Sequence, residues 1–269
     1  MIIRNWQDME PKVRKQAALE WVIITGNSGL ASHEYISRVW IQPGMILEKD
    51  EHQKEEEVLY VVSGIGRALV SEKSYALKNG DTVYMPAGET YQILNGGPEP
   101  LELVAFGADV EKEALEDRGI VIKNWREAKP WMLVKVHGYG IDWRMMRKRI
   151  DPSATAPPKS KVILESGEEL VSKADEEEKA IPCFRTINFF SYAQLQPGKS
   201  YEAHGHMAEE IYYMIKGKGT IRAFKEDNST EDFSLRPGDV CVTPVGEKHK
   251  LINDGDEFIE FIAWGASRK

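Results

Sequence analysis

The chain contains one sequence pattern twice, and this repeat constrains the fold more than any other feature. Gly80-Asp-Thr-Val-Tyr-Met-Pro-Ala-Gly88 matches Gly238-Asp-Val-Cys-Val-Thr-Pro-Val-Gly246 at each glycine, aspartate and proline. Further along, Leu103-Val-Ala-Phe-Gly107 matches Phe261-Ile-Ala-Trp-Gly265. A long internal repeat predicts two domains of the same fold in a chain of 269 residues.

The starts of the two copies set the expected domain boundaries. Ile3-Arg-Asn-Trp6 matches Ile122-Lys-Asn-Trp125. We therefore expect a first domain over 1–108, a charged linker over 109–119 and a second domain over 120–269. The second copy has about 35 extra residues, which we expect near 147–180. Two interpretations of this insertion stay open, a lid over a pocket or an exposed decoration.

Short apolar runs broken by turn residues predict that both domains are built from strands. From Trp21 to Gly107 the chain alternates aromatic and β-branched runs with Gly, Pro, Asn and Asp at short intervals. This pattern is typical of a small β-barrel. The first twenty residues are the exception, because Asn5 before Trp6 is a plausible cap for a short helix.

The second copy contains a group of potential metal ligands. His204 and His206 are two residues apart, so on a strand both imidazoles reach the same side. Glu210 opens a strand-like run, and His249 follows the turn at Pro244-Val-Gly246. Imidazole and carboxylate suit Fe, Mn, Ni, Co, Cu or Zn, and ligand type does not choose among them. Satisfied surface or core histidines are the alternative, but three of the six histidines gather here.

These residues resemble the cupin superfamily. Its first motif, G-x5-H-x-H-x3,4-E-x6-G, is filled by Gly198 through Gly217, and its second, G-x5-P-x-G-x2-H-x3-N, by Gly238 through Asn253. The resemblance implies a bicupin, an all-β protein of two small antiparallel jelly-roll barrels with a few short helices. It also implies a divalent metal held by His204, His206, Glu210 and His249, and dimerisation of two copies of the chain.

The first copy keeps the scaffold of the motifs and loses ligands. Asp50 and His52 stand at the positions of the two histidines, Glu57 at that of the glutamate, and Tyr91 replaces the last histidine. A phenol with an ordinary pKa of about 10 and two carboxylates make a poorer site for a transition metal. We expect a structural barrel; the alternative is a site for a harder ion or a small ligand.

Two residues near the expected metal are candidates for substrate binding or catalysis. Tyr212 shares a strand face with Glu210, so its hydroxyl is a weak candidate for a catalytic or hydrogen-bonding group; the alternative is an aromatic packed in the barrel. Arg222 follows the Gly217-Lys-Gly219 turn and would pair with a substrate carboxylate if it pointed inward.

Composition limits the partners and the compartment. A formal net charge of −8 argues against nucleic acid, whose phosphates would be repelled. No run approaches the roughly 20 apolar residues of a membrane span, and the start lacks the pattern of a secretory signal. Cys183 and Cys241 do not form a disulfide framework. We expect a cytoplasmic protein with a small-molecule ligand.

Three functions remain open at this stage. The first is a metal-dependent enzyme acting on a small metabolite, with a dioxygenase slightly favoured because iron accepts this ligand set well. The second is its non-oxidative form, an isomerase, decarboxylase or lyase in which the metal acts as a Lewis acid. The third is a non-catalytic, metal-assisted binding protein. The residues do not identify the substrate, the metal or the reaction.

Overall fold

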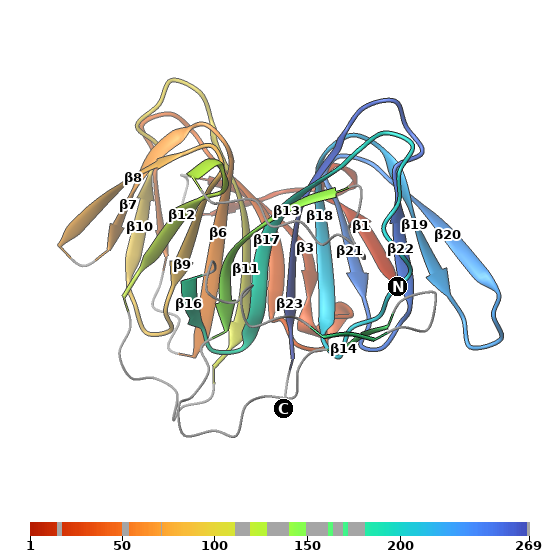
Figure 1. Cartoon of the computed structure of the whole chain (residues 1–269). Coiled ribbons are helices and arrows are strands. Elements are labelled where there is room, and N and C mark those ends of the chain that lie inside the picture. Colours follow the sequence, from red (N-terminus) through yellow and green to blue (C-terminus); the bar gives the residue numbers. More distant parts are fainter. Residues whose placement is uncertain are drawn as a thin grey trace. The chain divides into compact units, whose positions relative to one another are not determined.

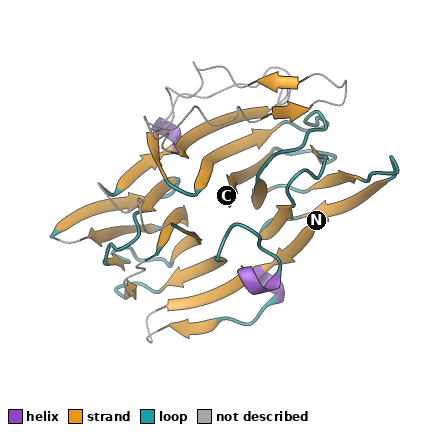
Figure 2. Cartoon of the chain, turned by 90° about the horizontal axis from the view of Figure 1, so that it is seen from below, coloured by secondary structure: helices purple, strands orange, loops and turns teal. Residues whose placement is uncertain are grey.

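The computed structural model describes residues 1–14, 18–49, 54–70, 72–110, 119–127, 140–148, 161–163, 169–171 and 181–267. Its contacts divide the chain into two units, Asn5–Glu127 and a second made of Met1–Arg4 with Ala128–Lys269. Strands dominate both units (Figures 1 and 2). The described helical segments are three short 3-10 turns, namely η1 (Trp6–Asp8), η2 (Gly26–Ser28) and η4 (Trp125–Glu127).

The unit Asn5–Glu127 consists of two antiparallel sheets. The larger sheet has the strand order β12-β9-β6-β11-β4-β3-β2, and the smaller has the order β5-β10-β7-β8. The strands of the larger sheet are β2 (Lys12–Arg14), β3 (Ala18–Thr25), β4 (Tyr35–Ile41), β6 (Glu55–Ser63), β9 (Asp81–Met85), β11 (Leu101–Asp109) and β12 (Val121–Asn124). Those of the smaller are β5 (Ile46–Lys49), β7 (Ile65–Val70), β8 (Lys73–Lys78) and β10 (Tyr91–Leu94).

The other unit repeats this plan. Its larger sheet has the order β1-β21-β18-β23-β17-β13-β16 and its smaller sheet the order β20-β19-β22. The strands are β1 (Ile2–Asn5), β13 (Gly140–Lys148), β16 (Ile181–Phe184), β17 (Ile187–Leu195), β18 (Glu209–Lys216), β19 (Gly219–Phe224), β20 (Thr230–Leu235), β21 (Asp239–Thr243), β22 (His249–Ile252) and β23 (Ile259–Ala266). The prediction of an all-β, antiparallel double barrel is confirmed, although β13 and β16 pair in parallel.

Part of the expected insertion near 147–180 is described. It contributes the antiparallel hairpin of β14 (Lys161–Ile163) and β15 (Glu169–Val171). Most of its other residues lie outside the described part of the chain, and so does the hypothesis of a lid. The expected 109–119 linker also falls largely outside it.

The leading strand of each copy lies in the sheet of the other copy. β1 precedes the first copy in sequence but pairs with β21 in the second unit. β12 precedes the second copy but pairs with β9, from Val121 opposite Tyr84 to Asn124 opposite Asp81. The short helix expected in the first twenty residues is the single 3-10 turn η1: Gln7 N donates to the capping Asn5 Oδ1 at 2.9 Å, and strands flank the turn.

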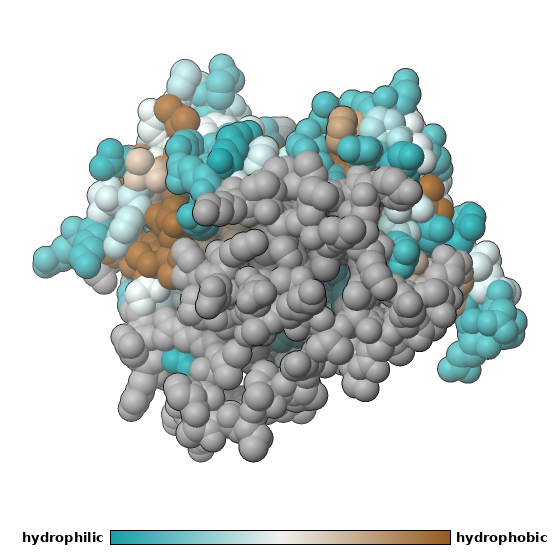
Figure 3. Space-filling model, in the orientation of Figure 1, coloured by the Kyte–Doolittle hydropathy of each residue, from teal (hydrophilic) through white to brown (hydrophobic). Residues whose placement is uncertain are grey.

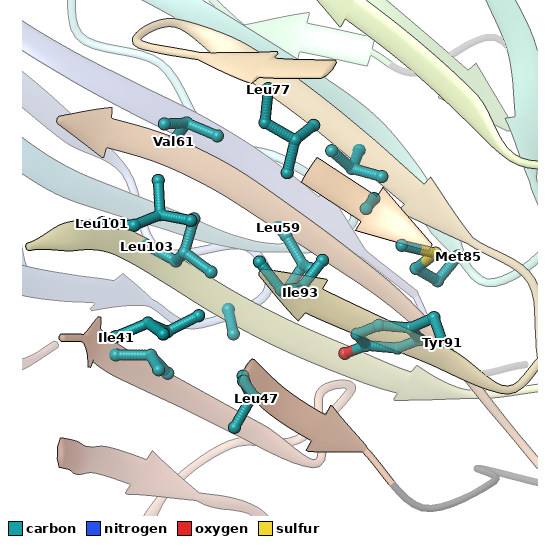
Figure 4. Close-up of a cluster of buried hydrophobic side chains, with 14 of the residues drawn as sticks. Ile41, Leu47, Leu59, Val61, Leu77, Met85, Tyr91, Ile93, Leu101 and Leu103 are labelled. Atoms are coloured by element: carbon teal, nitrogen blue, oxygen red, sulfur yellow. The ribbon is translucent and has the colours of Figure 1, made fainter. Parts of the chain in front are cut away.

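Each barrel encloses its own apolar core. In the first, Leu101, Leu103 and Ala105 of β11 alternate into a cluster that also contains Leu59, Ile93 and Tyr91 (Figure 4). The corresponding cluster of the second unit includes Met214, Ile221, Leu251 and Phe261. Hydrophilic residues cover the tips of the β7–β8 and β19–β20 hairpins (Figure 3). Among the described residues, no helix is long and apolar enough to cross a membrane.

Two motif positions have the same structural role in both barrels. Gly64 and Gly217 adopt φ angles of +89° and +77°, and a Cβ there would lie 2.7 and 2.6 Å from backbone oxygens. Any side chain at these turns would therefore clash. Asn95 Nδ2 donates to the carbonyls of Ile41 and Glu99, each at 2.8 Å, and Asn253 repeats the pattern. These residues build the scaffold, which explains why the first copy retains them.

Candidate metal centre

The four ligand candidates of the second copy lie together. One nitrogen or oxygen from each of His204, His206, Glu210 and His249 lies within 4.8 Å of every other. Glu210 belongs to β18, His249 begins β22, and the two other histidines lie in the segment between β17 and β18. His204, Glu210 and His249 are buried, whereas the side chain of His206 is 19% exposed. The exposed part of His206 is not the ring nitrogen beside Glu210, because His206 Nε2 is buried.

Backbone hydrogen bonds join the two motif segments. His204 N donates to His249 O at 3.0 Å, and His249 N donates to His204 O at 2.8 Å. Gly246 N donates to His206 O at 2.8 Å. These bonds hold the imidazoles of residues far apart in sequence against each other, with ring centroids of His204 and His249 4.7 Å apart.

The backbone also fixes which ring nitrogens face the cluster. His204 Nδ1 lies 2.8 Å from the carbonyl oxygen of Glu202, and His249 Nδ1 lies 2.9 Å from that of Glu247. A carbonyl oxygen only accepts, so each Nδ1 carries the hydrogen when the ring is neutral. Each Nε2 then presents its lone pair toward the cluster, which is the arrangement of a metal-binding histidine.

The contacts of the Glu210 carboxylate gather on one oxygen, Oε2. It lies 2.9 Å from His206 Nε2 and 3.2 Å from His249 Nε2. Burial raises the pKa of Glu210, but His206 and then His249 outweigh burial and hold the pKa well below its ordinary value. The carboxylate is therefore ionised at neutral pH and able to bind a cation.

The donor set fits a divalent transition metal. Two ligand atoms that are each about 2.1 Å from one ion are at most about 4.2 Å apart. The four candidate atoms lie within 4.8 Å of one another, so small movements would allow all four to bind one ion. His206 Nε2 is buried and, although close to Glu210 Oε2, makes no bond of hydrogen-bonding geometry within the described residues. A metal ion would satisfy this nitrogen.

Tyr212 lies directly beside this group. Its hydroxyl donates to Glu210 Oε2 at 2.8 Å and lies 3.1 Å from His249 Nε2. Burial, followed by the charge of Glu210, raises the pKa of Tyr212 well above its ordinary value. The phenol thus keeps its proton. Arg222 is different: its half-exposed guanidinium pairs with Asp232 at 2.7 Å, so the hypothesis of an inward-pointing arginine is wrong.

Two of the four corresponding positions in the first barrel are described. Asp50 and His52 lie outside the described residues. Glu57 and Tyr91 meet, because the Tyr91 hydroxyl donates to Glu57 Oε2. Tyr35, which the sequence analysis did not single out, donates to Glu57 Oε1. Aligning the two copies would have revealed it, because Tyr35 stands where the second copy has Phe189.

The comparisons with known proteins agree with the fold and the motifs. The cupin domain family matches residues 37–107 and 191–265, which together make up more than half of the chain. An oxalate-binding protein of Thermotoga maritima is 40% identical over 75 residues, which cover 28% of this chain and 58% of that protein. Acireductone dioxygenase 4 of Oryza sativa is 27% identical over 101 residues, covering 34% and 55%. The chain thus spans little more than half the length of these two relatives.

Solved structures share the fold over almost the whole chain. Oxalate decarboxylase of Lactobacillus farciminis, in a formate complex, superimposes with a TM-score of 0.69 at 16% identity, covering 99% of this chain and 86% of that one. Oxalate decarboxylase of Bacillus subtilis gives 0.68 at 16% identity, covering 99% and 76%. The fold and the site define a bicupin whose His and Glu cluster could bind a metal. The chain belongs to the cupin family.

Proposed function

We propose that this chain is a metal-dependent enzyme acting on a small carboxylate metabolite in its C-terminal barrel. The proposal depends on one observation, the convergence of three imidazoles and an ionised carboxylate within 4.8 Å. His204, His206, Glu210 and His249 would hold the ion. A six-coordinate ion with four protein ligands keeps about two positions for substrate or water.

A carboxylate substrate is supported by charge and by relatives. A divalent ion would attract an anion, and Arg222 is engaged by Asp232, so an anionic substrate would bind chiefly to the ion itself. The Thermotoga relative is an oxalate-binding protein, and the structural neighbours are oxalate decarboxylases. We therefore favour a small mono- or dicarboxylate with oxygen atoms on adjacent carbons, such as oxalate.

The non-oxidative reaction is our first candidate. A divalent ion supplies Lewis-acid stabilisation of negative charge on a bound carboxylate or enolate. Tyr212 keeps a protonated hydroxyl beside His249 and Glu210, and such a group can donate to an oxyanion near the ligands. A decarboxylation, elimination or isomerisation uses both features. The dioxygenase that the sequence favours is the second candidate, supported by the similarity to acireductone dioxygenase 4.

Non-catalytic binding is the third candidate and has its own support in the oxalate-binding relative. We also propose a homodimer, as the family resemblance implies.

The experiment that separates the three functions incubates the metal-loaded chain with oxalate and related two- to four-carbon acids, with and without oxygen. Turnover without oxygen supports the first candidate and oxygen-dependent turnover the second. Saturable binding without turnover would reject an enzyme acting on these acids.

A further inference from the structure

The first barrel has a buried carboxylate at the place where the second barrel has Glu210. Glu57 of β6 lies opposite Gly107 of β11, and Glu210 of β18 lies opposite Gly265 of β23. Both glycines end the same repeated segment of the sequence. Glu57 is buried, with 2% exposure. A buried carboxylate is costly unless it is paired or hydrogen-bonded, so its partners define what the site can hold.

One partner replaces a metal ligand. Tyr91 begins β10 and lies opposite Val70 of β7, whereas His249 begins β22 and lies opposite Ala223 of β19. Tyr91 therefore occupies the position of the second-motif histidine, and its ring lies among the core side chains in Figure 4. Its hydroxyl donates to Glu57 Oε2.

A second partner, Tyr35, differs from its counterpart by a single hydroxyl. Tyr35 packs over Gly107, where an added Cβ would lie 2.8 Å from Tyr35 Cε1. Phe189 packs over Gly265 in the same way, at 2.9 Å from such a Cβ. The two rings thus hold equivalent places, and the hydroxyl that Phe189 lacks is the group that donates to Glu57 Oε1.

These contacts satisfy the buried carboxylate without a metal ion. Each oxygen of Glu57 already accepts a hydrogen bond from a phenol. Burial, followed by the charge of Glu57, raises the pKa of both Tyr35 and Tyr91 well above the ordinary value, so both stay protonated. A protonated phenol carries no charge and is a weaker ligand for a divalent ion than the imidazole at the corresponding position of the second barrel.

We infer that hydrogen bonds from Tyr35 and Tyr91 to Glu57 take the place of the metal in the first barrel and make that barrel independent of metal. The bridge joins three strands, because Tyr35 begins β4, Glu57 lies in β6 and Tyr91 begins β10. It therefore connects the larger sheet to the smaller one. In the second barrel, Glu210 and His249 span the corresponding two sheets with a contact of 3.2 Å, and an ion bound by both would reinforce it.

Hydrogen exchange of the full chain, measured peptide by peptide, tests this inference. Mn²⁺ should slow exchange in peptides of β18 and β22 relative to chelator, whereas peptides of β6 and β10 should exchange equally in both. Tyr91→Phe, which keeps the ring, should speed exchange of β6 and β10 about 5- to 100-fold in either condition, since it leaves a buried acceptor unsatisfied. Tyr35→Phe, which copies Phe189, is the milder variant should Tyr91→Phe fail to fold.

Metal binding by a variant without the second site is the complementary test. His204→Ala should take up no stoichiometric Mn²⁺, Ni²⁺ or Zn²⁺. Chelator-sensitive exchange in β6 and β10 would overturn the inference. One equivalent of metal in His204→Ala that is lost when Glu57→Gln is added would also overturn it. Hydrogen exchange that stays unchanged in both Tyr91→Phe and Tyr35→Phe would do the same. None of these readouts depends on whether the second barrel is catalytic.

Discussion

Tyr212 and Glu210 lie two residues apart on β18, and the Tyr212 hydroxyl donates a hydrogen bond of 2.8 Å to Oε2 of Glu210. Their side chains share a face because successive residues of a strand point to opposite sides. The same Oε2 is the oxygen closest to His206 and His249. Tyr212 thus orients the oxygen that we propose as a metal ligand.

Removing the Tyr212 hydroxyl should weaken metal binding without unfolding the barrel. We expect Tyr212→Phe to lower metal affinity about 10- to 100-fold, the usual effect of losing a partner that orients a ligand. Calorimetric titration with Mn²⁺ measures it. Tyr192→Phe is the matched control, because its hydroxyl donates to Glu260 at 2.5 Å, outside the cluster. Equal affinities in the two variants would show that Tyr212 does not orient Glu210.

Metal affinity should fall with acid through the titration of imidazole. Burial raises the pKa of Glu210, but His206 and His249 hold it well below its ordinary value, so this carboxylate stays ionised while the solution is acidified through pH 5. A protonated imidazole ring cannot bind a metal ion, so we expect affinity to decline as the solution is acidified. An affinity that stays constant to pH 4.5 would contradict binding by the histidines.

The ionised Glu210 carboxylate should stabilise the metal-free chain at neutral pH, and this stabilisation should be lost in acid. Because the folded pKa of Glu210 is depressed, its stabilisation is present above the pKa of the unfolded chain, about 4.3, and is lost as pH falls through the folded value. Acid unfolding of the metal-free chain through this residue should therefore occur below about pH 4. Glu210→Gln should remove that component of the denaturation profile.

Strand β1 should stabilise the second unit, which contains the candidate metal ligands, rather than the first unit, which follows β1 in the sequence. Ile3 of β1 packs against the core of the second unit, whereas Arg4, next to it, is exposed. We expect Ile3→Ala to destabilise by about 1 to 2 kcal/mol, less than a fully buried isoleucine, and Arg4→Ala by less than about 0.5. Hydrogen exchange should locate the effect of Ile3→Ala in β21 and β18. Faster hydrogen exchange in β9 instead would contradict the pairing of β1 with β21.

Both cysteines should resist thiol reagents in the native chain. Cys183 and Cys241 form no disulfide and are buried, and burial raises the pKa of Cys241 well above its ordinary value. The reactive thiolate is therefore scarce and inaccessible. Ellman's reagent should label neither residue until denaturant is added. Rapid labelling of the native protein would show that these strands open readily.

The sequence was sufficient for the grouping of His204, His206, Glu210 and His249. The motif spacing brought the first two together, although the structure places both in the segment between β17 and β18 rather than in the expected strand. The repeated Gly, Asp and Pro positions specify the turns that return His249 to them. Local pattern also identified Asn5 as a cap. It did not reveal that Ile2–Asn5 pairs with β21, because an edge strand carries no local mark of its partner.

The first barrel shows a second limit of sequence reasoning. Glu57 and Tyr91 were predicted to share a degenerate site from their motif positions alone. The role of Tyr35 depends on a contact from another strand, and a tyrosine at the start of a strand is by itself an ordinary core residue. Aligning the two copies position by position turns that tyrosine into a signal, since Phe189 is its counterpart.

Metal content of the purified chain, measured beside His204→Ala and Tyr91→Phe, tests the central claim most directly. We predict about one equivalent of a divalent transition metal in the parent and in Tyr91→Phe, and almost none in His204→Ala, because three of four ligands hold an ion far more weakly. No metal in the parent after reconstitution, or the same content in His204→Ala, would contradict a metal centre in the C-terminal barrel.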